Sequence, residues 1–291
     1  FDLPLAYIEI LFNIKKIENV YYLKHLLSFL IFLLSSFFFY KILFQRFNNF
    51  FLSLAGTILF ITTPRIFGDS FFYKDILFLS FFNIGLYFLL KASDKLSLKN
   101  IFFFAIFSAI TFNLRIFGIF LPITFFLILI IKSFSDKNIY IYIKFYLVYF
   151  LSLMLLIVLF SPYLWSNPLN NFFDIFLALS RDLIGSNIKI LFNNEFIINR
   201  NVPNTYLLTW IFISTPIATL TLFLLGYFFY SKRFINRFIN IKKEQIYNDL
   251  WRGQNEQKDF IIFFILTSFY LSLLVLNSPF YNGWRLVYFL N

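Results

Sequence analysis

Long apolar runs, separated by short polar segments, make up most of this chain; Leu23–Phe44 and Tyr142–Phe160 are two of them. About 20 apolar residues in a helix are enough to cross the hydrocarbon core of a bilayer. The chain is 60% hydrophobic and 13% charged, whereas soluble domains are about 45–50% apolar and about 25% charged. This composition excludes an ordinary soluble enzyme, and the 24% aromatic content excludes a disordered chain. Lipid is therefore the expected solvent.

The expected fold is all-α, a polytopic bundle of about eight membrane segments. Three of the segments are short, which fits re-entrant or bundle-packed helices as well as full spans. The eight candidates are Leu23–Phe44, Phe51–Thr63, Ile76–Leu90, Ile101–Phe112, Ile116–Ile131, Tyr142–Phe160, Thr209–Tyr230 and Phe260–Leu276.

Positive charge predicts the orientation, because cytoplasmic loops carry an excess of Lys and Arg. If the segment before Leu23 is external, the internal loops hold most of the 25 basic residues. The net charge of +11 then reflects this loop bias rather than a nucleic-acid partner. The internal loops are expected to be solvated connectors, and Ser231–Asp259 a solvated loop with some helix, whose basic stretch contacts anionic lipid.

The numbers of cysteine and histidine residues exclude several kinds of functional site. The chain has no Cys, which excludes disulfides, thiolate zinc sites and thiol nucleophiles. It has one His, His25, which excludes a histidine-rich metal site and is expected to be a packing or interfacial residue.

Unusual polar residues gather on the expected outer face. Thr63–Asp75, the Asn113–Arg115 corner, Ser161–Leu208 and Asn277–Arg285 all fall there. The charged residues at or near span ends are Arg65, Asp69, Lys74, Asp75, Arg115 and Arg285. One interpretation is interfacial anchoring by snorkelling. The other is a functional site, because charges near the membrane are costly unless they face a bundle interior or a water-filled cavity.

The residue types on this face are suited to binding phosphate. Arg binds phosphate through its bidentate fork, and Lys as a point charge. Asp69 and Asp75 could orient Arg65 and Lys74, bind a divalent metal or act as a base, and simple ion pairing is an equal alternative. Two carboxylates six residues apart, without a nearby His, are a weak metal signal.

Aromatic residues and an amphipathic segment complete the outer face. Tyr163, Trp165, Tyr281 and Trp284 fit an aromatic belt at headgroup level, and such rings also stack on sugars. In Leu169–Arg181, apolar and polar residues alternate as in an amphipathic helix in the interface or a helix that caps the bundle.

Four motifs occur in order on this face. They are Pro64–Gly68 followed by Lys74-Asp75-Ile76, Leu114–Gly118, Pro162–Trp165 and Tyr281–Arg285. Together they resemble bacterial integral-membrane glycosyltransferases of the GT-C superfamily. The most similar type is the dolichyl-phosphate-mannose-protein mannosyltransferase-like group, related to the lipid A aminoarabinose transferases, and the resemblance covers the whole chain.

The resemblance implies an inner-membrane enzyme that moves a sugar from a polyprenyl-phosphate donor to a protein, lipid or glycan acceptor on the extracytoplasmic side. Arg65, Lys74, Arg115 and Arg285 match the family's basic positions and would stabilise the phosphate leaving group. Asp69, Asp75, Tyr163, Trp165, Tyr281 and Trp284 would support them. No cofactor is implied with certainty, although a divalent metal is possible.

The family's acidic base lies in the first external loop, and the resemblance places that loop upstream of Phe1. We therefore expect residues 1–291 to be one transferase domain of a longer protein, without its first span and that loop. The alternatives are a transporter or flippase, or a binding subunit, for a lipid-linked precursor, and a structural membrane subunit.

Overall fold

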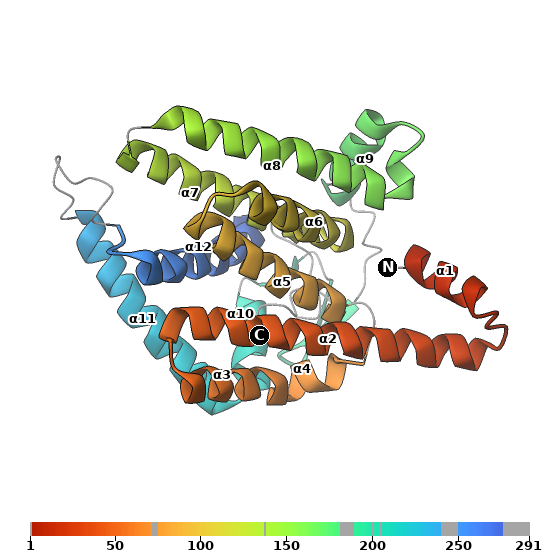
Figure 1. Cartoon of the computed structure of the whole chain (residues 1–291). Coiled ribbons are helices and arrows are strands. Elements are labelled where there is room, and N and C mark those ends of the chain that lie inside the picture. The colour runs from red at the N-terminus through yellow and green to blue at the C-terminus, as the bar shows by residue number, and fades with distance from the viewer. Residues whose placement is uncertain are drawn as a thin grey trace.

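The computed structural model shows a helical bundle (Figure 1) and describes residues 2–71, 75–136, 138–180, 189–198, 201–203, 205–239 and 250–275. The elements are, in order, α1 (Asp2–Leu11), α2 (Ile17–Phe47), α3 (Phe50–Thr62), α4 (Pro64–Asp69), α5 (Asp75–Asp94), α6 (Leu98–Leu114), the 3-10 helix η1 (Ile116–Ile119), α7 (Phe120–Asp136), α8 (Ile139–Phe160), the 3-10 helix η2 (Pro162–Leu164), α9 (Pro168–Ser180), β1 (Lys189–Phe192), β2 (Glu195–Ile198), α10 (Thr205–Ser214), α11 (Ile217–Ile239) and α12 (Gln254–Val275).

Four helices in the described part of the chain are long and apolar enough to cross a membrane. They are α2, α5, the continuous stretch Ile116–Phe134 and α8. Helices also form on the other expected segments, but α3, α6 and α10 are shorter than a spanning helix. The chain is thus a mostly helical bundle with four membrane-length helices, rather than about eight equivalent ones.

The expected span Thr209–Tyr230 is wrong as one continuous helix. The structure ends α10 at Ser214 and begins α11 at Ile217. Pro216 explains the break, because it lacks a backbone N–H and disfavours the helical conformation of the residue before it, Thr215. The carbonyl oxygen of Pro216 instead accepts a hydrogen bond from the backbone N–H of Leu220, at 3.0 Å, within the first turn of α11.

Helix α5 lies at the centre of the bundle (Figure 1). It packs against α2, α6 and α7, and more weakly against α12 and α4. Ile76, Phe78 and Leu89 are fully buried, and buried residues occur on every side of the helix. A helix that is apolar all round belongs in a core, so α5 is the element that positions the others.

Short turns connect α2 to α3 and α5 to α6, and so place these helices side by side as antiparallel pairs. Between α2 and α3, Asn48 adopts a left-handed conformation with φ of 49°, and the side chain of Asn49 accepts a hydrogen bond from the backbone N–H of Leu52 at 3.1 Å. Between α5 and α6, the hydroxyl of Ser97 accepts one from the backbone N–H of Asn100 at 3.3 Å. Such caps satisfy backbone donors that a helix start leaves unpaired.

A β-hairpin follows α9, and the expectation of a purely α fold missed it. Strands β1 and β2 pair antiparallel through the two-residue turn Asn193-Asn194. Both asparagines have positive φ, 51° and 66°, as a type I′ turn requires. The Asn193-Asn194 pair between two short runs rich in Ile and Phe was the sequence signal for this hairpin.

Candidate functional site

The described residues of the expected outer site lie at one end of the bundle. Arg65 and Asp69 belong to α4, Asp75 to the first turn of α5, and Arg115 to the corner between α6 and η1. We call these four residues the outer cluster.

Several residues of the expected site lie outside the described part of the chain. They are Lys74, Tyr281, Trp284 and Arg285, together with Arg181 at the end of the expected amphipathic helix. Phe1, upstream of which the resemblance places the acidic base, is also outside the described residues. The position of that base therefore stays a prediction, and the outer cluster carries the geometric argument.

Helix α4 presents two members of the outer cluster. Pro64 occupies its first turn, where a missing N–H costs nothing. Arg65 and Asp69 are four residues apart and therefore share one helix face. Between them, Ile66 is 1% exposed and belongs to the main core, and α4 packs against α3 and α5. The buried isoleucine thus fixes the short helix on the bundle with both charged residues half-exposed.

The corner that carries Arg115 depends on a glycine. Arg115 is extended, with φ of −153° and ψ of 142°, and η1 follows it directly. A Cβ atom on Gly118 would lie 2.5 Å from the backbone nitrogen of Phe112 and 2.7 Å from its Cα. Only glycine allows η1 to approach the end of α6 so closely. The sequence therefore needs Gly118 to reverse direction and hold Arg115 at this corner.

Arg115 and Asp75 form an ion pair across 40 residues of sequence. Their side chains are 22% and 10% exposed, and the guanidinium carbon of Arg115 also lies 5.9 Å from the ring centroid of Phe78. The expected partners of Asp75 were Arg65 and Lys74, so this pairing is a finding of the structure. A half-buried pair of this kind orients the guanidinium and joins the α6–η1 corner to the start of α5.

His25 holds the chain just after α4, at Phe71. Its Nδ1 is hydrogen-bonded to the carbonyl oxygen of Phe71, and the ring of Phe71 stacks on Phe29 with centroids 4.9 Å apart. Helix α2 supplies both contacts. His25 is thus a packing residue, one of the two roles expected for it, and it ties Phe71, just after α4, to α2.

Tyr163 and Trp165 lie at the end of α8, with side chains that point outward. Leu164 between them is buried, whereas Tyr163 is 57% and Trp165 58% exposed. The indole Nε1 of Trp165 donates to the carbonyl oxygen of Val158 at 2.9 Å, and the amide of Asn171 donates to that of Tyr163 at 2.6 Å. Both residues are thus held by polar contacts while their ring faces remain accessible.

The amphipathic helix is present as α9. Phe172 and Ile175 are half-buried against the main core, and Phe172 lies 6.1 Å from Phe112, centroid to centroid. Leu169 and Phe173 are 75% and 64% exposed. Helix α9 therefore packs one apolar side on the bundle and leaves the other to its surroundings, as an interfacial helix does.

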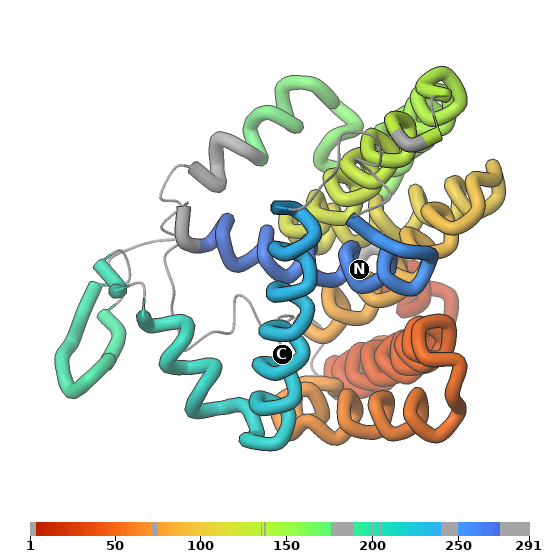
Figure 2. The backbone as a smooth tube through the Cα atoms, turned by 90° about the vertical axis from the view of Figure 1, so that its left-hand side faces the viewer, coloured from red at the N-terminus to blue at the C-terminus, as the bar shows by residue number. Residues whose placement is uncertain are grey.

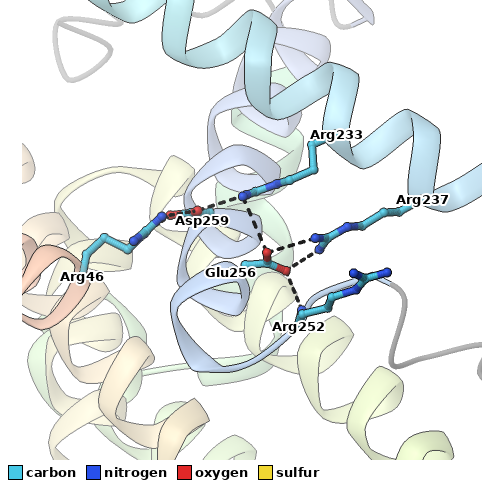
Figure 3. Close-up of polar contacts among 6 residues, drawn as sticks. All are labelled: Arg46, Arg233, Arg237, Arg252, Glu256 and Asp259. Carbon is cyan, nitrogen blue, oxygen red and sulfur yellow. Dashed lines mark hydrogen bonds and ion pairs between the residues drawn. The ribbon is translucent and has the colours of Figure 1, made fainter.

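A second charged cluster lies at the opposite end of α5, and it was not predicted from the sequence. Ser231–Asp259 was expected to be a solvated loop with some helix, and its helical parts are the end of α11, with Arg233 and Arg237, and the start of α12, with Glu256 and Asp259. Figure 3 shows Arg46, Arg233, Arg237, Arg252, Glu256 and Asp259, which we call the inner cluster.

Asp259 connects three helices in the inner cluster. Its Oδ2 accepts hydrogen bonds from Nη2 of Arg46 at 2.8 Å and from Nη2 of Arg233 at 3.0 Å (Figure 3). Arg237 binds Glu256 through both Nη atoms and holds the pKa of that carboxyl at about 2, well below its usual value. Nearby, Nζ of Lys258 lies 3.4 Å from Oδ2 of Asp94, at the last turn of α5.

A cavity between two of the described helices, α11 and α12, adjoins the inner cluster. It measures about 540 Å³ and is lined by α11 from Leu222 to Arg233 and by α12 from Asp259 to Leu266. No group of three or more His, Cys, Asp or Glu side chains within the described ranges could hold a metal ion.

Comparison with known proteins adds no relative. No protein-family model matches the chain, and no curated protein or solved structure is detectably similar to it. The residues themselves are therefore the basis for a functional assignment.

Proposed function

We propose that this chain is part of a membrane glycosyltransferase with a GT-C-like fold, in which about eight segments, the short helices included, enter the bilayer. The enzyme takes a sugar from a polyprenyl-phosphate donor at the extracytoplasmic face of the inner membrane and transfers it to a protein, lipid or glycan. The observation that supports this most is the half-buried Arg115–Asp75 pair beside the α4 helix that carries Arg65.

A fixed cation at this position fits the chemistry of the reaction. Negative charge develops on the phosphate oxygens as the sugar leaves, and preorganised cations stabilise it without reorganising during the step. Asp75 orients Arg115, while Arg65, Lys74 and Arg285 supply further positive charge. The exposed faces of Tyr163 and Trp165 are available to stack on a sugar ring.

Activation of the acceptor is a separate requirement. In this proposal the acidic base belongs to an external loop upstream of Phe1, so the residues of the outer cluster stabilise the leaving group rather than remove the acceptor proton. With proton removal assigned to another residue, the role of Asp75 is to orient Arg115, with which it forms an ion pair.

The test uses the full-length protein in proteoliposomes with synthetic polyprenyl-phosphate hexoses and pentoses. Release of free polyprenyl phosphate reports transfer, whereas movement of the intact donor across the membrane would indicate a transporter. We expect Arg65→Ala to lower turnover roughly 100-fold, the usual cost of one charge-stabilising group. Lys16→Ala is the control, because Lys16 is an exposed cation at the same end of the bundle. Normal turnover by Arg65→Ala would contradict the assignment.

The natural absence of cysteine makes the orientation directly testable. A Cys at exposed Ser166 should react with an impermeant maleimide in intact cells, and one at exposed Asn138 should not. Reversed labelling would place the outer cluster on the cytoplasmic side and remove the proposed donor site.

A further inference from the structure

Helices α11 and α12 meet at one end and diverge at the other, as Figures 1 and 2 both show. Near the inner cluster they are joined by aromatic packing: the ring centroid of Phe263 lies 4.7 Å from Tyr230 and 5.1 Å from Tyr227. Further along, the helices separate and leave the cavity of about 540 Å³, which we call the α11–α12 groove. Its volume lies within the ~300–1,000 Å³ range of small-molecule sites.

The groove is apolar over its length and charged at one end. Aromatic and aliphatic side chains line it from Leu222 and Leu266 to Tyr230, and Arg233 and Asp259 close it. None of the described residues of α11 is buried, so the other described segments leave this apolar face accessible. Gly226 contributes open space, because no atom lies within 4 Å of where its Cβ would be.

The groove is long enough to hold much of an acyl chain. Leu222 and Arg233 are separated by about 17 Å along the helix axis at 1.5 Å per residue. Figures 1 and 2 show α11 crossing the bundle at a steep angle to α2 and α8, so a chain lying in the groove is tilted relative to the membrane-length helices.

The inner cluster carries more positive than negative charge. It contains four arginines and two carboxylates (Figure 3). Arg46, Arg233 and Arg237 are engaged by Glu256 and Asp259, whereas the guanidinium of exposed Arg252 has no partner among the described residues. The sequence between α11 and Leu250 contains two Lys, one Glu and one Asp, and so adds no net charge.

We propose that the α11–α12 groove binds one anionic phospholipid from the leaflet on the side of the Lys- and Arg-rich loops. One acyl chain lies along Gly226 and Phe263, and the headgroup phosphate binds Arg252 and Arg233. The excess positive charge complements the phosphate, and the apolar length of the groove complements the acyl chain. The cytoplasmic leaflet is the one that carries anionic lipids. This site is independent of sugar transfer, which the outer cluster would perform.

Native mass spectrometry of the full chain, released from nanodiscs of phosphatidylglycerol and phosphatidylcholine, tests the proposal. We expect one phosphatidylglycerol to remain bound and phosphatidylcholine to be lost. Gly226→Phe adds a ring at a position that lines the groove and where a Cβ atom meets no other atom, and it should reduce retention at least tenfold. Leu225→Phe is the matched control, because Leu225 is the neighbouring residue but does not line the groove.

The headgroup contact is tested separately. Arg252→Gln should lower retention roughly tenfold, the usual cost of a charge-assisted hydrogen bond, and Arg252→Lys should recover most of it. An unchanged elution volume in size exclusion shows that these exposed-site variants still fold.

Several results would overturn the proposal. Equal retention of phosphatidylglycerol by the unmodified chain and by Gly226→Phe would exclude the groove as the binding site. Displacement by inorganic phosphate alone would indicate a free-anion site, and preferential retention of polyprenyl phosphate a different lipid. A dimer that Gly226→Phe dissociates would show that a second copy of the chain covers the groove.

Discussion

The tetrapeptide Arg-Ile-Phe-Gly occurs twice in this chain, at residues 65–68 and 115–118, and the two copies fold differently. The first is helical within α4, with buried Ile66 and with open space around Gly68. In the second, Arg115 is extended, a 3-10 helix follows, and Gly118 is pressed against the backbone of α6. Identical residues thus have different roles, because one copy follows a proline that starts a helix and the other ends a helix and must reverse direction.

The largest difference between the copies in free energy of unfolding is expected when their glycines are replaced. Gly118→Ala places a Cβ among backbone atoms of Phe112 and should lower the free energy of unfolding by about 4 kcal/mol, at the upper end for overpacking. Gly68→Ala meets no atom and should change it by no more than about 1 kcal/mol, in the stabilising direction. Equilibrium unfolding in detergent micelles, followed by circular dichroism, measures both. Equal effects would show that the two corners are equivalent.

The second difference concerns the acids that accompany each copy. Asp75→Ala leaves the half-buried Arg115 without its carboxylate and should cost about 3 kcal/mol of unfolding free energy. Asp69→Ala, at a more exposed position beside the first copy, should cost no more than about 1 kcal/mol. The same unfolding assay separates them. If Asp75→Ala were as mild as Asp69→Ala, the Arg115–Asp75 pair would not hold the corner.

Packing of the two isoleucines provides a smaller contrast. Ile66 is 1% exposed in the core, so Ile66→Ala should leave a cavity and cost about 2 kcal/mol. Ile116 is only partly buried, and Ile116→Ala should cost about 1 kcal/mol because its site can relax. Thermal midpoints of the two variants in one detergent give the order, and a reversed order would mean that α4 packs less firmly than η1.

Asn113 and Thr63, each two residues before the arginine of one copy, are expected to differ least in their contribution to stability. The side-chain amide of Asn113 donates to the carbonyl oxygen of Ile157 at 3.2 Å, and so joins the second copy to α8. Asn113→Ala should therefore cost about 1 kcal/mol. The hydroxyl of Thr63 donates back to the carbonyl oxygen of Leu59, within its own segment, and Thr63→Ala should cost less than about 0.5 kcal/mol. Double variants with Asp75→Ala would test whether Asn113 and Asp75 support the corner independently.

Helices were predictable from the apolar runs because their period and length are local properties. The predicted Leu23–Phe44, Ile76–Leu90 and Tyr142–Phe160 all lie within membrane-length helices, and the amphipathic pattern after Pro168 forms α9. Pro216 is a local signal for the break between α10 and α11, and the Asn193-Asn194 pair is one for the hairpin. The long apolar runs around them nevertheless favoured a single span and an all-helical chain.

The ion pairs were not predictable in the same way. Arg46 and Asp259 are 213 residues apart, and Arg115 and Asp75 are 40 apart. Each charged residue has several possible partners in the sequence, and residues close in sequence are the natural choice. This is why Arg65 and Lys74 were the expected partners of Asp75. Polar runs at the ends of α11 and α12 resembled solvated connectors because helix ends and loops share the same composition.

The sequence by itself determined that this chain is a helical membrane protein, because apolar surface on this scale is stable only in lipid. It also predicted that Arg65, Asp69, Asp75 and Arg115 lie at one end of the bundle, since that depends only on the order of runs and motifs. Tertiary structure decided how those residues are used: that one Arg-Ile-Phe-Gly is a helix and the other a corner, that Asp75 pairs with Arg115, and that four arginines gather at the opposite end. Those outcomes depend on distances between distant segments, which packing around α5 sets.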